Sequence, residues 1–191
     1  CNIGGCTGSF VSADGLILTN HHCAFRAIQS ASSKENDYLE NGFLAKSTSE
    51  EIPARGYTVR ITESYRDVSD DVLSAIADSM DLAERTKAID KKIKEIVTET
   101  EKQNPGKRAE VSEMFIGKTY VLFIYTYLKD IRLVYAPPRS IGNFGGEEDN
   151  WMWPRHTGDF SFMRAYVAPD GAPADFSTDN VPYQPKKYLQ V

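Results

Sequence analysis

The sequence predicts a mainly β protein with a single helical insertion. Short segments rich in β-branched and aromatic residues occur at residues 16–18, 119–128, 131–135 and 160–167, a composition typical of strands. Between them, residues 67–103 show the apolar spacing of an amphipathic helix. We therefore expect strands before and after the insertion, which itself would form one or two helices.

The first expected strands form a hairpin. Residues 10–11 and 16–18 are apolar and flank Asp14-Gly15, a strong signal for a two-residue hairpin turn. The chain then enters residues 20–24, where we expect a single helical turn or a tight loop.

The expected domain division follows the change of pattern along the chain. Residues 1–66 and 115–191 are assigned to the β domain, and residues 67–114 to the helical insertion. Apolar residues recur every three or four positions across residues 72–97, and Pro105 follows soon after as a helix breaker. The apolar helix face is expected to pack on the parent domain rather than in a partner's groove.

Composition and charge exclude several classes of function. Hydrophobic residues make up 41% of the 191 residues and charged residues 26%, as in an ordinary globular protein. No apolar run is long enough for a membrane span. The net charge of −5 argues against nucleic-acid binding, which needs a basic patch. The chain starts without a signal peptide, so any export signal is expected to be removed or to lie outside it.

A histidine-containing motif after the hairpin predicts peptidase chemistry. Chymotrypsin-like folds place the catalytic histidine after a strand of the first barrel, commonly in a Thr-x-x-His-Cys run, and an upstream cysteine closes a disulfide over the hairpin. Here Cys6 precedes the hairpin, and Thr19 is followed by His21, His22 and Cys23. We expect the first barrel of a chymotrypsin-like double β-barrel, with His22 as the general base and His21 as the alternative.

The same motif predicts a disulfide between Cys6 and Cys23. Closing a loop of this length contributes about 3 kcal/mol in the chain-entropy model, and a disulfide implies an oxidising compartment. The alternative is a pair of free buried thiols. Cys1 has no predicted partner.

The orienting carboxylate is expected to be Asp159. It stands at the start of an expected strand, where apolar residues alternate in the following positions. A simple turn aspartate is the other interpretation, because Thr-Gly-Asp is good turn chemistry. The rival acids Glu147, Glu148 and Asp149 crowd a Gly-rich loop, which suggests a solvated or substrate-facing rim.

A zinc site is the competing interpretation of the histidines. It would use His21, His22, Cys23 and His156. Adjacent residues rarely converge on one tetrahedral ion, and known sites use spaced pairs of ligands. We therefore expect no metal and no other cofactor.

Three long segments carry a resemblance to a known family. They are GCTGSFVS at residues 5–12, LTNHHC at residues 18–23 and NWMWPRHTGDFS at residues 150–161. They resemble the bacterial serine dipeptidyl peptidases related to dipeptidyl peptidases seven and eleven. The resemblance implies removal of dipeptides from free peptide N-termini, homodimers, and a periplasmic, cell-surface or secreted location in Gram-negative bacteria. It also implies that a helical domain caps the cleft of the double barrel.

The resemblance further implies roles for individual residues. His22 and Asp159 would be two of the three catalytic residues, and Asn150 and Trp151 would hold the substrate's α-amino group. An amide oxygen and an aromatic face suit a charged ammonium. For Trp153, core packing is the more ordinary expectation.

The expected nucleophile is missing from the chain. Chymotrypsin-like enzymes present their serine in a Gly-x-Ser-Gly loop, and the nearest match surrounds Ser9 inside the first hairpin. We expect Ser9 to be structural and the nucleophile to come from a second barrel, which this chain lacks together with the helical cap domain. The chain would then be an N-terminal fragment that is inactive alone.

Two other functions remain open. One is a fragment of a trypsin-like periplasmic endopeptidase, whose histidine motif also reads Thr-Asn-x-His; the pair Asn150 and Trp151 disfavours it, since endopeptidases need no amine clamp. The other is a catalytically dead barrel that acts as a peptide-binding module.

Overall fold

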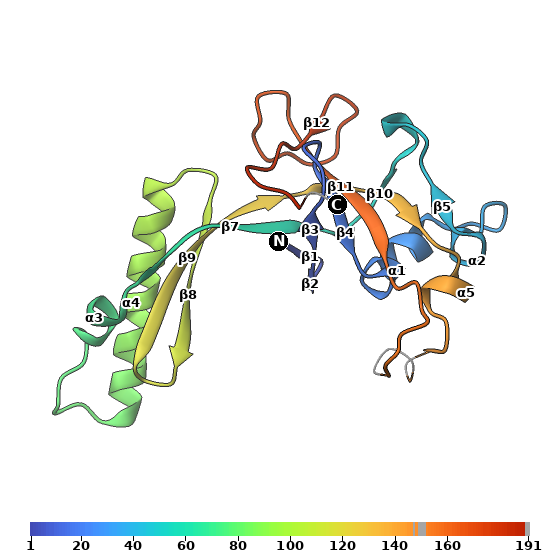
Figure 1. Cartoon of the computed structure of the whole chain (residues 1–191). Helices are drawn as coiled ribbons and strands as arrows, with labels where there is room; N and C mark the ends of the chain where they lie inside the picture. Colours follow the sequence, from blue (N-terminus) through green and yellow to red (C-terminus); the bar gives the residue numbers. More distant parts are fainter. Residues whose placement is uncertain (147, 149–151, 190–191) are drawn as a thin grey trace. The chain divides into compact units, whose positions relative to one another are not determined.

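The computed structural model describes residues 1–146, 148 and 152–189, and its secondary structure is mainly β (Figure 1). The chain divides into two compact units. Unit 1 comprises Cys1–Arg60 and Leu128–Val191, and unit 2 comprises Ile61–Tyr127. Among the described residues, no helix combines the length and the apolar character that crossing a membrane requires.

Unit 1 is built on one sheet with the strand order β3-β4-β11-β10-β5, to which β12 adds on β11 and β6 adds on β10. A short pair, β1 and β2, lies beside the start of β7. The strands are β1 (Asn2–Ile3), β2 (Cys6–Thr7), β3 (Ser9–Phe10), β4 (Leu16–Thr19), β5 (Phe43–Leu44), β6 (Ile52–Pro53), β7 (Val59–Asp67, continuing into unit 2), β10 (Asp130–Ala136), β11 (Ser161–Val167) and β12 (Val181–Pro182). The helices are α1 (His21–Ala31), α2 (Tyr38–Asn41), the 3-10 helix η1 (Thr48–Glu50) and α5 (Arg139–Gly142).

The central strands of this sheet supply the core of unit 1. Ile17, Leu133, Met163 and Ala165 are at most 1% exposed. Strand β11 is antiparallel to β4 and pairs Ser161 with Thr19. Because antiparallel neighbours run past each other's ends, this register brings the residues just before β11 beside the residues just after β4.

The first hairpin is present, but its turn is longer than predicted. The amide of Val11 donates to the carbonyl of Leu16 at 2.8 Å, so four residues rather than two form the loop. The hydroxyl of Ser12 accepts hydrogen bonds from the amides of Asp14 and Leu16. Gly15 has a φ of +69°, and the backbone passes too close there for a Cβ.

The expectation of a single helical turn at residues 20–24 is wrong. Helix α1 has eleven residues. Ala24, Ala27 and Ile28 are buried on one of its faces, the spacing that an amphipathic helix needs. Polar residues such as His22, Arg26 and Gln29, which stand between them and around them, concealed this pattern in the sequence.

Unit 2 packs a long helix on a small sheet of order β7-β9-β8. Its buried core consists of Val68, Val72, Tyr120 and Leu122, on which Ile89, Ile93 and Ile96 of the helix pack. The helix begins with a capping box formed by Asp81 and Glu84. Besides β7, the elements of unit 2 are α3 (Ser69–Leu73), the long helix α4 (Leu82–Gln103), β8 (Arg108–Phe115) and β9 (Thr119–Leu128).

Two helices are therefore present within residues 67–103, as the sequence predicts. The helical insertion expected over residues 67–114 is nevertheless helical only as far as Gln103, since strand β8 follows. Ala109 and Val111 of β8 pack against the same core. Their spacing of two residues is the period of a strand, and mixed polar neighbours hid it.

Candidate active site

The described site residues lie where β4 and β11 meet. His22 is in the first turn of α1, which follows β4 directly, and Asp159 stands two residues before β11. The pairing of Ser161 with Thr19 brings them together although 137 positions separate them in the sequence. The fold thus makes a contact that the sequence could only suggest.

The carboxylate of Asp159 accepts three hydrogen bonds in this site. The backbone amide of His22 donates to Oδ1 at 3.0 Å, and Nδ1 of the His22 ring lies 2.8 Å from Oδ2. The side-chain amide of Asn20 donates to Oδ2 at 3.1 Å. The Asp159 side chain is 6% exposed, whereas that of His22 is 54% exposed. The acid is therefore held inside the site, and the imidazole reaches solvent.

The hydrogen bonds to Asp159 outweigh the effect of burial on the pKa of its carboxyl. Burial alone would raise the pKa of this carboxyl, but the bonds from the His22 amide and ring, the His22 charge and the Asn20 amide together bring the pKa below its usual value. Asp159 is thus ionised near neutral pH. An ionised carboxylate only accepts, so Nδ1 of His22 must carry a proton and donate it, which leaves Nε2 of the neutral ring free to accept one.

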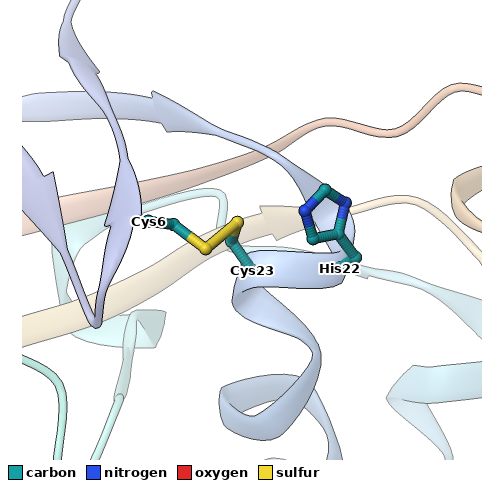
Figure 2. Close-up of side chains that lie close together, drawn as sticks. All are labelled: Cys6, His22 and Cys23. Atoms are coloured by element: carbon teal, nitrogen blue, oxygen red, sulfur yellow. A yellow bond between two sulfur atoms is a disulfide. The ribbon is translucent and has the colours of Figure 1, made fainter. Parts of the chain in front are cut away.

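The structure contains the disulfide between Cys6 and Cys23 that the sequence predicts. Figure 2 shows it beside the His22 ring. The bond links β2 to the first turn of α1 and closes a loop with a sequence separation of 17. It therefore anchors the residue that follows His22, and the alternative of two free thiols is wrong. Cys1 is free and exposed.

The disulfide also bears on the zinc interpretation. Donor atoms of Cys6, His22 and Cys23 lie within 4.8 Å of one another. Both sulfurs are bonded to each other, however, and zinc binds thiolates. Cys23 therefore cannot serve as the ligand that this interpretation requires.

His21 is buried, unlike the half-exposed His22. It is 1% exposed, its ring packs edge-on against Phe25 at 6.4 Å between centroids, and its Nε2 has no hydrogen-bond partner among the described residues. Burial lowers its pKa, against the smaller opposing effect of the Asp159 charge. The structure thus brings His22, rather than the alternative His21, into contact with Asp159.

The remaining predicted residues have mixed outcomes. Asn150 and Trp151, as well as the rival acids Glu147 and Asp149, lie outside the described residues. Trp153 is 84% exposed, so the expectation of core packing is wrong for it. Its neighbours Met152 and Pro154 are exposed too, so no residue of the described stretch 152–154 packs in a core.

Sequence reasoning missed one contributor to the site, Asn20. Its amide group donates to both the backbone carbonyl and the carboxylate of Asp159. The available signal was its place between Thr19 and the histidines, where an asparagine side chain can cap the start of a helix. In the structure Asn20 makes no side-chain cap and binds Asp159 instead.

Comparisons with known proteins give the context of this geometry. A family model described as Peptidase S46 matches residues 2–191. An Asp/Glu-specific dipeptidyl-peptidase of Capnocytophaga gingivalis is 44% identical over 98% of this chain and 26% of its own length. Dipeptidyl-peptidase 7 of Porphyromonas gingivalis is 42% identical over 98% of this chain and also 26% of its own length.

The fold is similar to a solved structure as well. The crystal structure of Porphyromonas endodontalis DPP11 in complex with the dipeptide Arg-Asp matches with a TM-score of 0.87 and 42% identity, over 98% of this chain and 28% of that one. The chain thus spans about a quarter of the length of the relatives it matches.

Proposed function

Because the chain belongs to the peptidase S46 family, we propose that it is the N-terminal part of a serine dipeptidyl peptidase that removes dipeptides from free peptide N-termini. The relatives with this activity in their names match it over nearly its whole length. His22 is the general base in this proposal, and Asp159 orients it.

The observation that carries the proposal is the contact between His22 and Asp159. The 2.8 Å contact at Nδ1 leaves the half-exposed ring with Nε2 as its proton acceptor. Such a base takes the proton from a serine hydroxyl as it attacks the scissile carbonyl and then donates it to the leaving amine. Asp159 stays ionised throughout and stabilises the imidazolium that forms in between.

The serine itself belongs to the longer protein in this proposal. Ser9, the nearest sequence match to a nucleophile loop, lies in strand β3 and pairs with Leu18, which supports a structural role. The nucleophile and its oxyanion hole would come from a second barrel, and residues 1–66 and 115–191 would contribute to the first barrel of a chymotrypsin-like pair. A helical cap domain would also lie outside this chain.

Recognition of the free N-terminus is assigned to Asn150 and Trp151. An exopeptidase must hold a charged ammonium at a constant distance from the scissile bond, and an amide oxygen with an aromatic face provides this. The relatives are named as dipeptidyl peptidases, which supports the assignment. No cofactor enters this chemistry.

The cellular setting follows from the disulfide and the family. The Cys6–Cys23 bond supports maturation in an oxidising compartment. We place the protein in the periplasm, at the cell surface or outside a Gram-negative cell, where the full-length enzyme would act as a homodimer on peptides.

The test uses the full-length protein and two fluorogenic dipeptide substrates, one with a free and one with an acetylated N-terminus. Release of the dipeptide from the free substrate only, and its loss in His22→Ala, is expected. Equal cleavage of the acetylated substrate would instead identify an endopeptidase. Peptide binding without any cleavage would identify a binding module, and either result would contradict the proposal.

The chain of 191 residues is expected to be inactive when expressed alone, because it holds the base and the orienting acid but no nucleophile. The same substrates measure this. Dipeptide release by the isolated chain that disappears in His22→Ala would show that a nucleophile lies within it.

A further inference from the structure

Helix α5 ends directly under the buried ring of His21. Gly142 is the last residue of α5, and a Cβ built on it would lie 2.5 Å from Cγ, 2.6 Å from Cδ2 and 2.8 Å from Nδ1 of His21. The ring thus occupies the space that any side chain at residue 142 would need. Gly142 is not in a left-handed conformation, so this close approach, rather than backbone freedom, requires a glycine here.

Ile141 and Gly142, the last two residues of α5, also bind the segment before Asp159. The amide of Gly158 donates to the carbonyl of Ile141 at 3.0 Å. The hydroxyl of Thr157 lies 3.1 Å from the Ile141 carbonyl and 3.2 Å from the Gly142 carbonyl, to which it can donate. Because Gly158 immediately precedes Asp159, these bonds determine where the carboxylate enters the site.

The segments that carry His22 and Asp159 therefore both contact Ile141–Gly142. His22 follows His21, which packs on Gly142, and Asp159 follows Gly158, which binds Ile141. Ile141–Gly142 is in turn bound to the residues that follow β10, since the amides of Ile141 and Gly142 donate to the carbonyl of Pro138 at 2.9 Å.

We propose that Ile141–Gly142 is a positioning element for the His22–Asp159 pair, with Gly142 and His21 as its positioning residues. The inference rests on the proposed function, since it gives the pair a catalytic task. His21 suits the role because its ring is held by packing: it is fully buried, and its Nε2 makes no bond to the described residues. A residue in this role touches no substrate and acts only through its neighbour.

The first experiment is Gly142→Ala in the full-length protein. The added methyl group must displace the His21 ring and with it His22. A misplacement of about 1 Å lowers the rate of the chemical step by about 100-fold, so kcat is expected to fall to that extent with KM little changed. The control is Gly171→Ala, whose added Cβ meets no atom within 4 Å. Because the φ of +83° at Gly171 strains any residue other than glycine, this variant should lose some stability, but its kcat should stay at the wild-type value.

A second readout does not depend on activity. The proton between Nδ1 of His22 and the Asp159 carboxylate should give a downfield resonance in the proton NMR spectrum of the full-length protein, shifted or lost in Gly142→Ala and unchanged in Gly171→Ala. If the wild-type protein releases no dipeptide, the proposed function fails, while this resonance still tests the positioning. An unchanged resonance in a folded Gly142→Ala would overturn the positioning role.

A double variant separates positioning from simple destabilisation. Removing the ring in His21→Ala opens the space that the new methyl group needs, so Gly142→Ala should lower kcat much less in that background than in the wild type. Equal losses in both backgrounds would contradict the proposed contact. Residues in contact are expected to show such non-additivity.

Thr157→Val provides a variant that keeps side-chain size, in case Gly142→Ala does not fold. It removes the hydroxyl that contacts the two α5 carbonyls. We expect a drop of about 10-fold in kcat, smaller than for Gly142→Ala because the Gly158 amide still binds Ile141. A wild-type kcat in this variant would count against the Asp159 half of the proposal.

Discussion

The two units of the chain differ in how they bury their polar groups. Unit 1 surrounds a charged cluster: Glu51 is 7% exposed, accepts a hydrogen bond from the Tyr166 hydroxyl at 2.7 Å and pairs with Arg164 at 2.8 Å. Burial first, and then Glu51, raise the pKa of Tyr166. Unit 2 has a small apolar core, its Lys107–Glu63 pair is partly exposed, and its β8–β9 turn exposes Phe115 and Ile116.

This difference shows which unit can hold reacting groups in place. Unit 1 satisfies buried charges with specific partners, and such networks define one arrangement of side chains. The His22–Asp159 contact and the disulfide both lie in it. Unit 2 relies on helix packing over a small core, and we expect changes there to affect stability and leave the chemistry intact.

The largest expected effect is on the chemistry of unit 1. Asp159→Asn in the full-length enzyme should lower kcat by about 10⁴-fold, because the amide no longer selects the reactive tautomer of His22. Hydrolysis of the free dipeptide substrate measures this. Asp175→Asn is the matched control: its side chain is 87% exposed, and its kcat should not change. A small effect of Asp159→Asn would mean that another acid orients the base.

A pair of core truncations compares the units directly. Leu133 in β10 and Leu122 in β9 are both 1% exposed. We expect Leu133→Ala to cost about 4 kcal/mol of unfolding free energy and Leu122→Ala about 2 kcal/mol, since the small core of unit 2 collapses more easily around the lost volume.

The two variants are compared by the rate of amide hydrogen exchange in each unit and by kcat. Leu122→Ala should speed exchange in unit 2 and leave kcat unchanged, whereas Leu133→Ala should affect both exchange in unit 1 and kcat. A loss of kcat in Leu122→Ala comparable with that in Leu133→Ala would show that the chemistry depends equally on both units.

Removing the disulfide probes unit 1 without removing a site residue. The double variant Cys6→Ala and Cys23→Ala should lose about 3 kcal/mol of unfolding free energy, because the unfolded chain regains the entropy of an open loop. Urea unfolding measures it. Cys1→Ala, at the free exposed cysteine, is the control and should change the midpoint little. A similar midpoint for both variants would contradict a stabilising disulfide.

The smallest effect is expected at the start of the long helix in unit 2. Asp81→Ala removes the side chain that accepts from the Glu84 amide at 2.8 Å and should cost about 1 kcal/mol. Asp78→Ala, at an exposed residue outside the helix, should cost much less. Equal losses in urea unfolding would argue against the cap, and a change in kcat would weaken the distinction between the units.

Much of the fold follows from local patterns in the sequence. The strands at residues 119–128 and 160–167, the hairpin and the two helices within residues 67–103 all have short-range signals of period two or 3.6, and the structure contains each of them. Strand β8 and the length of α1 were missed because polar residues interrupt their periodicity. Local propensity is a weak signal in such segments, where packing decides the outcome.

The sequence by itself predicted that His22 and Asp159 form a pair and that Cys6 is bonded to Cys23. Cys6, His22 and Cys23 stand in a motif of recognisable spacing, and Asp159 shortly precedes a segment with the alternating pattern of a strand. Only the tertiary structure decided how they are held. The bonds from Asn20 to Asp159 span 139 positions, and the packing of His21 on Gly142 depends on a missing Cβ. Neither leaves a local pattern, because both result from the strand register that brings distant segments together.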